Sequence, residues 1–379
     1  MSSRPRKIAL GACLAALACL AAAGAFSACG SSGDDAGYQA QGPDERVDGG
    51  GDAKIDLHEE WPDGDTLEAA IPEAAPTFDD ETDAGGDAGP PPMHLPCDGK
   101  SGSLGDTTLT MTYGGLVRTA LVHTPDGWQN ADSRMLVLNF HGFTSDGLQE
   151  EVLSRMNGAA DEHGFVVVYP YGVAQSWNAG KCCGDAWTNS VDDVGFVRAL
   201  LYRLESDYCI DDKRVYATGM SNGGFLSHRL GCEVADRFAA IAPVAGVMGI
   251  DPMDCKPPRP VPVIEFHGTK DPLVPYDGGN PVLNIGVAGT LDFPSVADTV
   301  QTWRTIDGCA GASTTIYQNG DATCVSWAPC SQGSDVVLCT IDGGGHTWPG
   351  GVPIPFLGYT SSDISATETM VSFFYAHPM

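Results

Sequence analysis

Basic residues are scarce in this sequence of 379 residues, which has 20 Lys and Arg against 49 Asp and Glu and a formal net charge of −29. Such an excess of negative charge repels the phosphates of nucleic acids and the headgroups of anionic lipids. The composition therefore argues against nucleic acid and against anionic membrane surfaces as partners.

The spacings typical of zinc sites are also missing. The sequence holds 13 cysteines, yet no two are spaced C-x₂-C, and no two histidines share helical spacing with a carboxylate. We therefore predict no metal site.

The first 29 residues have the composition of an export signal. A basic start at 1–7 is followed by an apolar stretch at 8–26 and by small residues directly before Cys29. This arrangement predicts a lipoprotein-type signal peptide at 1–29, with Cys29 lipidated and the protein anchored at the surface, in a bacterial outer membrane. Because Phe26 stands where leucine is usual, cleavage at a nearby alanine and plain secretion is the alternative.

Residues 30–96 have a different composition. They hold 18 Asp or Glu against two basic residues, Arg46 and Lys54, and few periodic apolar positions. High like charge with little apolar surface cannot offset the entropy of folding, so we expect an acidic disordered linker. A binding segment for cations or for a basic partner is the alternative.

The remaining residues, 97–379, are enough for one large domain with a substantial core. Ten of the cysteines fall here, and an even number in an exported domain predicts disulfides. Adjacent cysteines close only a strained ring, so we expect Cys182 and Cys183 each to bond a different element.

Short apolar runs alternate with stretches of helical periodicity after position 130. The sequence predicts strands at 135–140, 165–169, 215–218, 238–243, 261–267 and 335–341, helices at 146–163, 192–208, 224–230, 295–306 and 363–375, and antiparallel leading strands within 106–123. This alternation predicts an α/β fold with a mainly parallel, doubly wound sheet and helices on both faces. In such sheets the chemistry gathers at the carboxyl ends of the strands.

Ser221 lies in the pentapeptide Gly219-Met-Ser-Asn-Gly223, between a predicted strand and a predicted helix. A G-x-S-x-G turn in that context is a nucleophile elbow, in which small residues let strand and helix approach and the serine hydroxyl is exposed at the sheet edge. The alternative is an ordinary Gly-Ser turn that opens a helix.

Two further candidates follow predicted strands, Asp271 after 261–267 and His346 after 335–341. The order Ser, Asp, His is that of the α/β-hydrolase triad, in which the histidine takes the serine proton and the carboxylate orients the histidine. His267 is an alternative base. Asp277 and Asp292 are alternatives to Asp271.

Such a serine also needs two backbone N–H groups for the developing oxyanion. One donor should be Asn222, directly after the serine. The other should come from the loop after strand 135–140, where we choose Phe143 because Gly142 permits the backbone turn. We expect His141 to shape this loop and not to react.

Tryptophans near these loops suggest a surface for rings. We expect three tryptophans to offer stacking faces to the substrate: Trp177, Trp187 and Trp348, the last of which lies two residues beyond His346. A core role is the alternative for Trp348. The first disulfide to expect is Cys309–Cys339, because the two cysteines flank the strand that leads to His346.

Seven stretches together are similar to one family. The sequence resembles the secreted feruloyl esterase and polyhydroxybutyrate depolymerase-like esterases, related to carbohydrate esterase family 1, over about 110–375. The stretches that carry the resemblance are 141–144, 182–187, 191–196, 214–224, 236–246, 266–271 and 344–350. The resemblance implies an α/β-hydrolase fold, no cofactor, and Ser221, Asp271 and His346 as the catalytic residues.

We therefore expect a serine esterase that forms an acyl-enzyme and cleaves feruloyl or acetyl esters of plant cell-wall polysaccharide. Because the family also cleaves aliphatic polyesters, a short-chain 3-hydroxybutyrate depolymerase is the main alternative. An inactive polysaccharide-binding lipoprotein is a second alternative. A serine peptidase is a third, although the chain lacks the propeller-sized domain common among peptidases of this fold.

Overall fold

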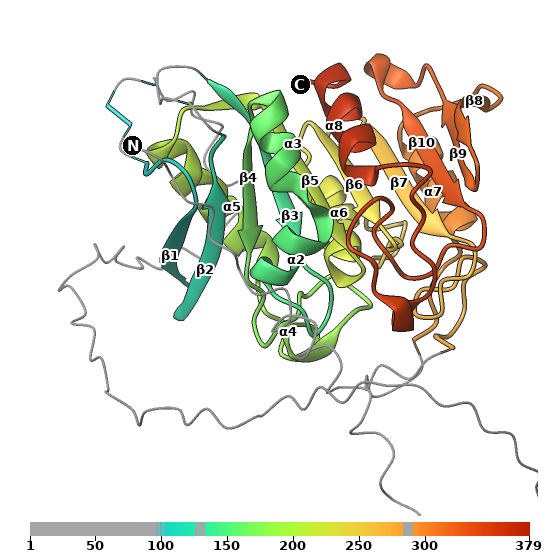
Figure 1. Cartoon of the computed structure of the whole chain (residues 1–379), viewed down its shortest axis with the longest axis horizontal. Helices are drawn as coiled ribbons and strands as arrows, with labels where there is room; N and C mark the ends of the chain where they lie inside the picture. Colours follow the sequence, from blue (N-terminus) through green and yellow to red (C-terminus); the bar gives the residue numbers. More distant parts are fainter. Residues whose placement is uncertain (1–96, 98, 101, 126–127, 129–132, 283–290) are drawn as a thin grey trace, which may run out of the picture. The chain divides into compact units, whose positions relative to one another are not determined.

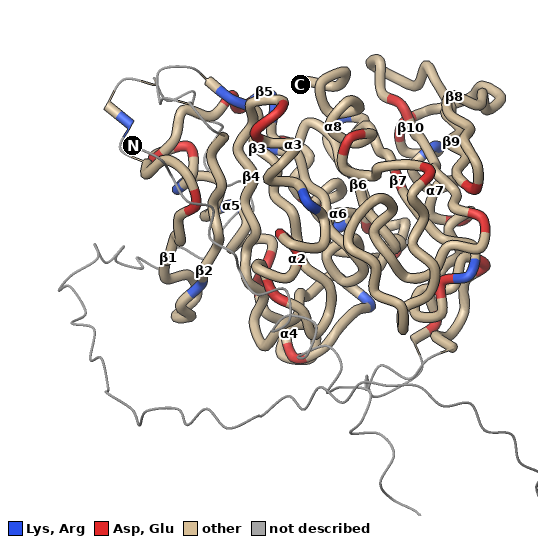
Figure 2. Tube along the Cα trace, in the orientation of Figure 1, with Lys and Arg blue, Asp and Glu red and all other residues tan. Residues whose placement is uncertain are grey.

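The computed structural model describes residues 97–379 apart from 98, 101, 126–127, 129–132 and 283–290. The predicted signal peptide at 1–29 with Cys29 and the predicted linker at 30–96 lie outside the described residues. Within the described part, no helix is both long and apolar enough to cross a membrane. Acidic residues outnumber basic ones here too, and both are sparse along the trace (Figure 2).

The described strands form one sheet in the order β1-β2-β4-β3-β5-β6-β7-β10-β9-β8 (Figure 1). The strands are β1 (Thr107–Tyr113), β2 (Leu116–His123), β3 (Arg134–Phe140), β4 (Val166–Pro170), β5 (Ile210–Met220), β6 (Ala240–Val244), β7 (Val263–Gly268), β8 (Thr314–Asn319), β9 (Ala322–Trp327) and β10 (Val336–Ile341). Neighbours from β4 to β10 in this order are parallel, whereas β1, β2, β9 and β8 pair antiparallel at the two edges.

Helices cover both faces of the sheet. They are α2 (Gly147–Ser154), α3 (Met156–His163), α4 (Gly184–Thr188), α5 (Asp193–Asp207), α6 (Asn222–Glu233), α7 (Val296–Ile306) and α8 (Ala366–Ala376), with 3-10 turns at Ser331–Gly333 and Pro355–Leu357. Successive side chains of a strand point to opposite faces. Leu136 and Leu138 of β3 therefore join the core cluster of α5, α6 and α7, whereas Met135 and Val137 join that of α3 and α8. The predicted fold class is confirmed.

The helix predicted at 146–163 is two helices, α2 and α3. Asp146 caps the first by accepting a hydrogen bond from the Gln149 N–H at 2.9 Å. Arg155 then adopts a left-handed conformation with φ 56°, and its N–H bonds back to Glu151. A left-handed residue ends a helix because it turns the chain away from the helical path. The apolar periodicity continues across this break, so the sequence pattern alone did not reveal it.

Strands β8 and β9 were not predicted. β8 is exposed along nearly its whole length and has no run of apolar residues, while β9 alternates buried and half-buried positions. A two-residue turn at Gly320 and Asp321 joins them, since Asn319 pairs with Ala322. An edge hairpin of this kind needs few apolar residues because only one of its faces meets the core.

Five disulfides join the ten cysteines of the domain, as expected: Cys97–Cys209, Cys182–Cys183, Cys232–Cys255, Cys309–Cys330 and Cys324–Cys339.

The predicted pair Cys309–Cys339 is wrong. Cys339 lies on β10 directly opposite Cys324 of β9, a pairing that depends on the unpredicted hairpin. Cys309, just after α7, bonds Cys330 instead.

The expectation for Cys182 and Cys183 is also wrong, because they bond each other. The peptide between them is cis, and the other eight cysteines pair among themselves.

Candidate active site

Ser221 stands in the sharp turn between β5 and α6. Its φ of 55° lies in a region that a residue with a side chain rarely adopts, so its backbone is strained. Glycines on both sides make the turn possible. A Cβ at Gly219 or at Gly223 would collide with the carbonyl oxygen of Phe140 on the neighbouring strand β3. The close approach of β3, β5 and α6 therefore requires glycine at these positions.

Ser221, Asp271 and His346 follow β5, β7 and β10, which are parallel strands of one sheet. Their carboxyl ends share one edge, so all three residues lie at that edge. Gly268 at the end of β7 packs against the backbone of Gly344 and Gly345, and Lys270 N–H bonds Gly344 O at 2.8 Å. The glycines before His346 therefore bring the two loops together.

Asp271 and His346 are hydrogen-bonded, with 2.7 Å between Asp271 Oδ2 and His346 Nδ1. The two residues are 4% and 2% exposed. The other carboxylate oxygen, Oδ1, accepts the N–H groups of Leu273 and Val274 at 2.8 Å each. Although burial alone would raise the pKa of Asp271, His346 and His267 hold it well below its usual range. Asp271 is therefore an ionised, tightly oriented acceptor.

The other residues considered for these two positions are placed differently. Asp277 and Asp292 are exposed, whereas Asp271 is the buried carboxylate on His346. His267 is fully buried beside Asp271, and its Nε2 donates to the carbonyl oxygen of Val274 at 2.9 Å. That nitrogen is engaged by a carbonyl, so it is not free to accept a serine proton.

The loop after β3 passes beside Ser221. A Cβ built on Gly142 would lie 3.4 Å from Ser221 Cβ and 3.9 Å from its Oγ. Beyond it, Thr144 has φ 65° and its N–H bonds Gln175 O at 2.9 Å. The backbone of this loop, which includes Phe143, is therefore held in a turn next to the serine.

His141 fixes that loop. Its Nε2 accepts the N–H of Gly172 at 2.9 Å, so Nδ1 carries the proton and donates to Gly142 O at 2.7 Å. Burial lowers the pKa of His141 to about 4, which keeps the ring neutral near pH 7. The residue shapes the loop, as its sequence position indicated.

Trp177 joins the loop to the start of α6. Its indole N–H donates to His141 O at 3.0 Å, and its backbone N–H and C=O bond the side-chain amide of Asn222 at 2.7 and 3.1 Å. The ring is fully buried. The expected stacking role of Trp177 is therefore wrong, and the residue instead joins the carbonyl of His141 to the side chain of Asn222.

The predicted stacking role of Trp348 is wrong as well. The side chain is 0% exposed, packs in the core cluster of α3 and α8, and donates its indole N–H to Thr367 Oγ1 at 3.0 Å. The large apolar ring of Trp348 is buried in the core, although the residue lies only two positions after His346 in the sequence. Trp187 on α4 differs, because its ring is 38% exposed. Gly184, the first residue of α4, packs against the ring of Phe143.

The sequence prediction missed two exposed aromatic residues near His346, Phe356 and Tyr359. The backbone between them folds along the His346 loop, because Leu357 O accepts the N–H of His346 at 2.8 Å and Tyr359 O accepts that of Gly345 at 2.9 Å. Both rings are 52% exposed. The available signal was a Pro-rich segment with aromatic residues shortly after the candidate base.

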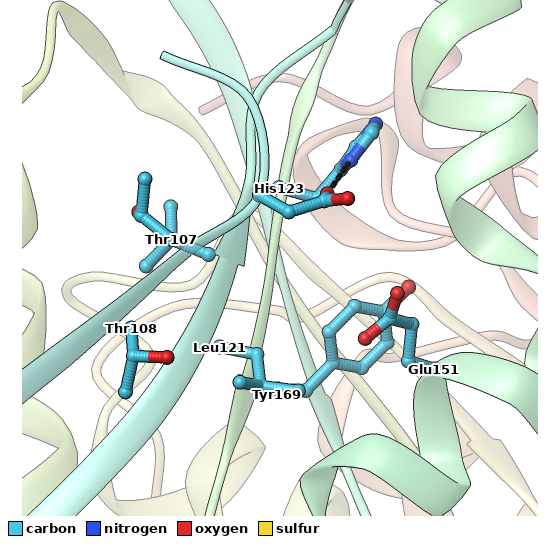
Figure 3. A pocket seen from close by; sticks show the side chains of 8 residues that line it. Thr107, Thr108, Leu121, His123, Glu151 and Tyr169 are labelled. Carbon is cyan, nitrogen blue, oxygen red and sulfur yellow. Dashed lines mark hydrogen bonds and ion pairs between the residues drawn. The ribbon is translucent and has the colours of Figure 1, made fainter. Parts of the chain in front are cut away.

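Two other features of the described residues lie away from these loops. A cavity of about 100 Å³ opens between β1, β2, β4 and α2, with His123 turned towards Asp106 at 2.6 Å (Figure 3). Among the described residues, one group of side chains has a spacing that suits a metal. It consists of the exposed residues Glu162, His163 and Glu368. Neither contains a predicted site residue.

Comparisons with known proteins give a consistent set of relatives. A family model described as Esterase PHB depolymerase matches residues 120–253. Feruloyl esterase B of Piromyces equi is 36% identical over 238 residues, which is 60% of this chain but only 42% of that protein. The putative esterase NocK of Nocardia uniformis subsp. tsuyamanensis is 32% identical over 295 residues, 71% of this chain and 83% of the relative.

Two more relatives extend the set. The bifunctional acetylxylan esterase/xylanase XynS20E of Neocallimastix patriciarum is 30% identical over 219 residues, 57% of this chain and 29% of that protein. The solved acetyl xylan esterase from Aspergillus awamori aligns over 71% of this chain and 99% of its own, with a TM-score of 0.50 and 14% identity. That structural likeness supports the α/β-hydrolase fold.

Proposed function

Because this chain belongs to the family of carboxylic ester hydrolases described by the PHB depolymerase model, we propose that it is a serine esterase with Ser221, Asp271 and His346 as its catalytic residues. The observation that carries the proposal is the 2.7 Å hydrogen bond between Asp271 and His346 at the sheet edge that also bears the strained Ser221. Strain at the serine of such an elbow is typical of these nucleophiles.

The bond to Asp271 assigns the two nitrogens of His346. Nδ1 carries a proton and donates it to the carboxylate, so Nε2 is the unprotonated nitrogen. Nε2 takes the proton of Ser221 as the hydroxyl attacks the ester carbonyl, and the serine oxygen forms the new C–O bond. The tetrahedral oxyanion that results then collapses: the bond between the acyl carbon and the alkoxy oxygen breaks, and His346 gives its proton to the leaving alcohol. Water next gives a proton to His346 and attacks the acyl carbon, and the bond to Ser221 breaks as His346 returns the proton to the serine oxygen and the acid is released.

The backbone N–H groups of Phe143 and Asn222 are the donors that we assign to the oxyanion. Asn222 is the first residue of α6, where helix N–H groups are unsatisfied and the helix dipole favours negative charge. Trp177 bonds the side chain of Asn222 and the carbonyl of His141, and so joins the two segments that carry these donors. Preformed donors of this kind contribute about 3–4 kcal/mol each to transition-state stabilisation.

The substrates we propose are feruloyl or acetyl esters of plant cell-wall polysaccharide, because relatives carry the names feruloyl esterase and acetylxylan esterase. Exposed aromatic rings support a substrate with ring faces. Trp187, Phe356 and Tyr359 now take the role first given to Trp348. The name of the family model supports the second candidate, a depolymerase of short 3-hydroxybutyrate polyesters.

We also propose that the protein works outside the cytoplasm, anchored through Cys29 or secreted. Five disulfides favour an oxidising compartment. Metabolic labelling with a fatty acid tests the anchor, since Cys29→Ala should abolish incorporation. Labelling that persists in this variant would contradict it.

Active-site labelling tests the proposed mechanism without a choice of substrate. A fluorophosphonate should react once per folded chain, and peptide mass spectrometry should place the adduct on Ser221. Prior denaturation should abolish labelling, because the hydroxyl of serine is unreactive without its base. An adduct on another serine, or equal labelling of the denatured chain, would contradict the assignment.

A further inference from the structure

A group of buried polar side chains from β7 and α6 lies next to Asp271. His228, Glu265 and His267, here called the buried array, have side chains that are 0% exposed. His267 Nε2 lies 3.5 Å from Asp271 Oδ2, His267 Nδ1 lies 3.5 Å from Glu265 Oε1, and Glu265 Oε2 lies 3.9 Å from His228 Nε2. These contacts run from the proposed catalytic residue Asp271 through His267 and Glu265 to His228.

The described contacts fix the proton of His228. The indole N–H of Trp303 donates to His228 Nδ1 at 2.9 Å, and an indole nitrogen is only ever a donor. Nδ1 is therefore unprotonated, and the ring proton sits on Nε2, which faces Glu265. Burial lowers the pKa of His228 to about 3, so this ring is neutral.

The described contacts of His267 and Glu265 determine every proton position on these two side chains except one. His267 Nε2 carries a proton because it donates to a carbonyl oxygen, that of Val274, at 2.9 Å. Its Nδ1 and both oxygens of Glu265 have no hydrogen-bond partner among the described residues. These unpartnered atoms face one another, so one further proton lies on the imidazole or on the carboxyl.

Two carboxylates decide where that proton lies. Burial alone would lower the pKa of His267, but Asp271 and Glu265 outweigh it and raise the pKa to about 10. Burial also raises the pKa of Glu265, which pulls the proton the other way. We place the proton on His267, because two carboxylates, those of Asp271 and Glu265, face this ring, whereas Glu265 faces only two imidazoles, one of which, that of His228, is neutral.

We propose that His267 is an imidazolium that stays charged over the pH range in which the enzyme works, is held by Glu265, positions Asp271 and keeps it ionised for its bond to His346. The inference rests on the proposed serine mechanism. His267 touches no reacting atom and is a positioning residue. Both imidazoles approach the same oxygen of Asp271, at 2.7 Å from His346 and 3.5 Å from His267. A positive charge on His267 therefore opposes the addition of a proton to the hydrogen-bonded pair of Asp271 and His346, and so extends activity to lower pH.

The other titratable group packed on His267 does not change this balance. The ring of Tyr276 meets it edge-on at 5.9 Å between centroids, and the Tyr276 hydroxyl pairs with Thr340 Oγ1 at 2.8 Å. Burial raises the pKa of Tyr276, so it is neutral when the enzyme works. The charges that face His267 are thus those of Glu265 and Asp271, together with His346 when it is protonated.

The pH dependence of kcat/KM on a small activated ester is the first test. His267→Gln removes the charge, so the acid limb should move to higher pH by about one unit, the size expected for a charge within 4–6 Å. His228→Gln perturbs the same buried array without removing a charge, so it should lower stability and leave the acid limb in place. An acid limb that stays in place in folded His267→Gln would overturn the proposal.

Nitrogen NMR of the histidine rings is the second test and needs no activity. At about pH 8, where an ordinary imidazole is neutral, one ring should remain doubly protonated, and its signal should be missing from His267→Gln. A singly protonated His267 at that pH would overturn the proposal.

If His267→Gln does not fold, Glu265→Gln serves instead, because loss of the counter-charge should lower the pH at which the doubly protonated ring titrates. A titration that does not change in this variant would overturn the proposal.

The two outcomes separate this inference from the serine mechanism. If Ser221→Ala stays active, the mechanism fails while the imidazolium signal stands. If the signal is absent from an enzyme that Ser221→Ala inactivates, only the role of His267 fails.

Discussion

The sheet edge at Ser221 and the loops around it are built differently. At the edge, Asp271 and His346 are almost fully buried, and the strained backbone of Ser221 is flanked by glycines at which a Cβ would collide with Phe140. In the surrounding loops and the short helical turns within them, three aromatic residues are between 38% and 52% exposed: Trp187, Phe356 and Tyr359. The sheet edge is therefore fixed before substrate arrives, whereas the surrounding segments carry exposed aromatic side chains that a bound ligand could cover.

This difference separates chemistry from selectivity. Groups that stabilise a transition state must be oriented in advance, which requires burial and hydrogen bonds. Side chains that choose among substrates contribute through contact area and through stacking of about 1 kcal/mol per ring. Substitutions at the edge should therefore lower the rate on every ester, and substitutions in the exposed loops should change the ranking of esters.

The largest expected effect is that of His346→Ala. Removing the base should lower kcat by about 10⁴-fold or more on every ester, since the members of a triad act as a unit. His267→Ala removes only a positioning residue and should cost clearly less. Initial rates of both variants, with circular dichroism to show folding, check this. A near-normal His346→Ala beside an inactive His267→Ala would reassign the base.

Trp348→Ala tests whether this residue belongs to the core or to the exposed loops. Removing a fully buried tryptophan should lower the free energy of unfolding by about 3–5 kcal/mol. The ratio of kcat/KM between methyl ferulate and a 3-hydroxybutyrate trimer should stay the same, measured where the variant is folded. A stable variant with an altered ratio would return Trp348 to the substrate surface.

Gly223→Ala tests the elbow itself. A Cβ there meets the backbone of Phe140 and His141, so we expect a loss of about 2–3 kcal/mol in stability, together with a loss of activity. The matched control is Gly158→Ala on α3, where a Cβ meets nothing within 4 Å. Alanine in that exposed helix should raise stability by about 0.5–1 kcal/mol. Urea unfolding compares the two, and equal effects would contradict the close approach at the elbow.

Phe356→Ala should give the smallest effect and the most selective one. Losing one stacking face should lower kcat/KM for methyl ferulate by about fivefold while leaving a small acetate ester unchanged. Tyr317→Phe, on the far hairpin β8–β9, is a control that should change neither rate. If Phe356→Ala lowers both rates alike, the exposed loops do not set selectivity.

Much of the site at the carboxyl ends of β5, β7 and β10 could be predicted, because the residues that indicate each strand end are adjacent in the sequence. An apolar run followed by glycine and a polar residue marks a strand end, and this pattern recurs before Ser221, Asp271 and His346. The order of these residues along the chain then predicts one shared site. Parallel strands bring their carboxyl ends together, so no distance had to be known.

What could not be predicted depends on contacts between distant segments. Trp348 is adjacent to the loop of His346, but its ring packs under α8 and bonds Thr367, which the sequence does not indicate. Cys339 finds Cys324 only through the register of β9 on β10. Likewise nothing in the sequence indicates that Glu265 is fully buried and lies against His228 of α6.

The measurement that tests the account most directly is the activity of Ser221→Ala. The variant should fold, since alanine only removes the hydroxyl, and it should lose about 10⁴-fold or more of its activity on small activated esters. Initial rates and circular dichroism are recorded on the same preparation. A native spectrum with almost no hydrolysis is the result we predict. A folded variant that keeps more than about one hundredth of the activity would contradict a serine mechanism, because residual catalysis by binding and oxyanion donors alone is far smaller.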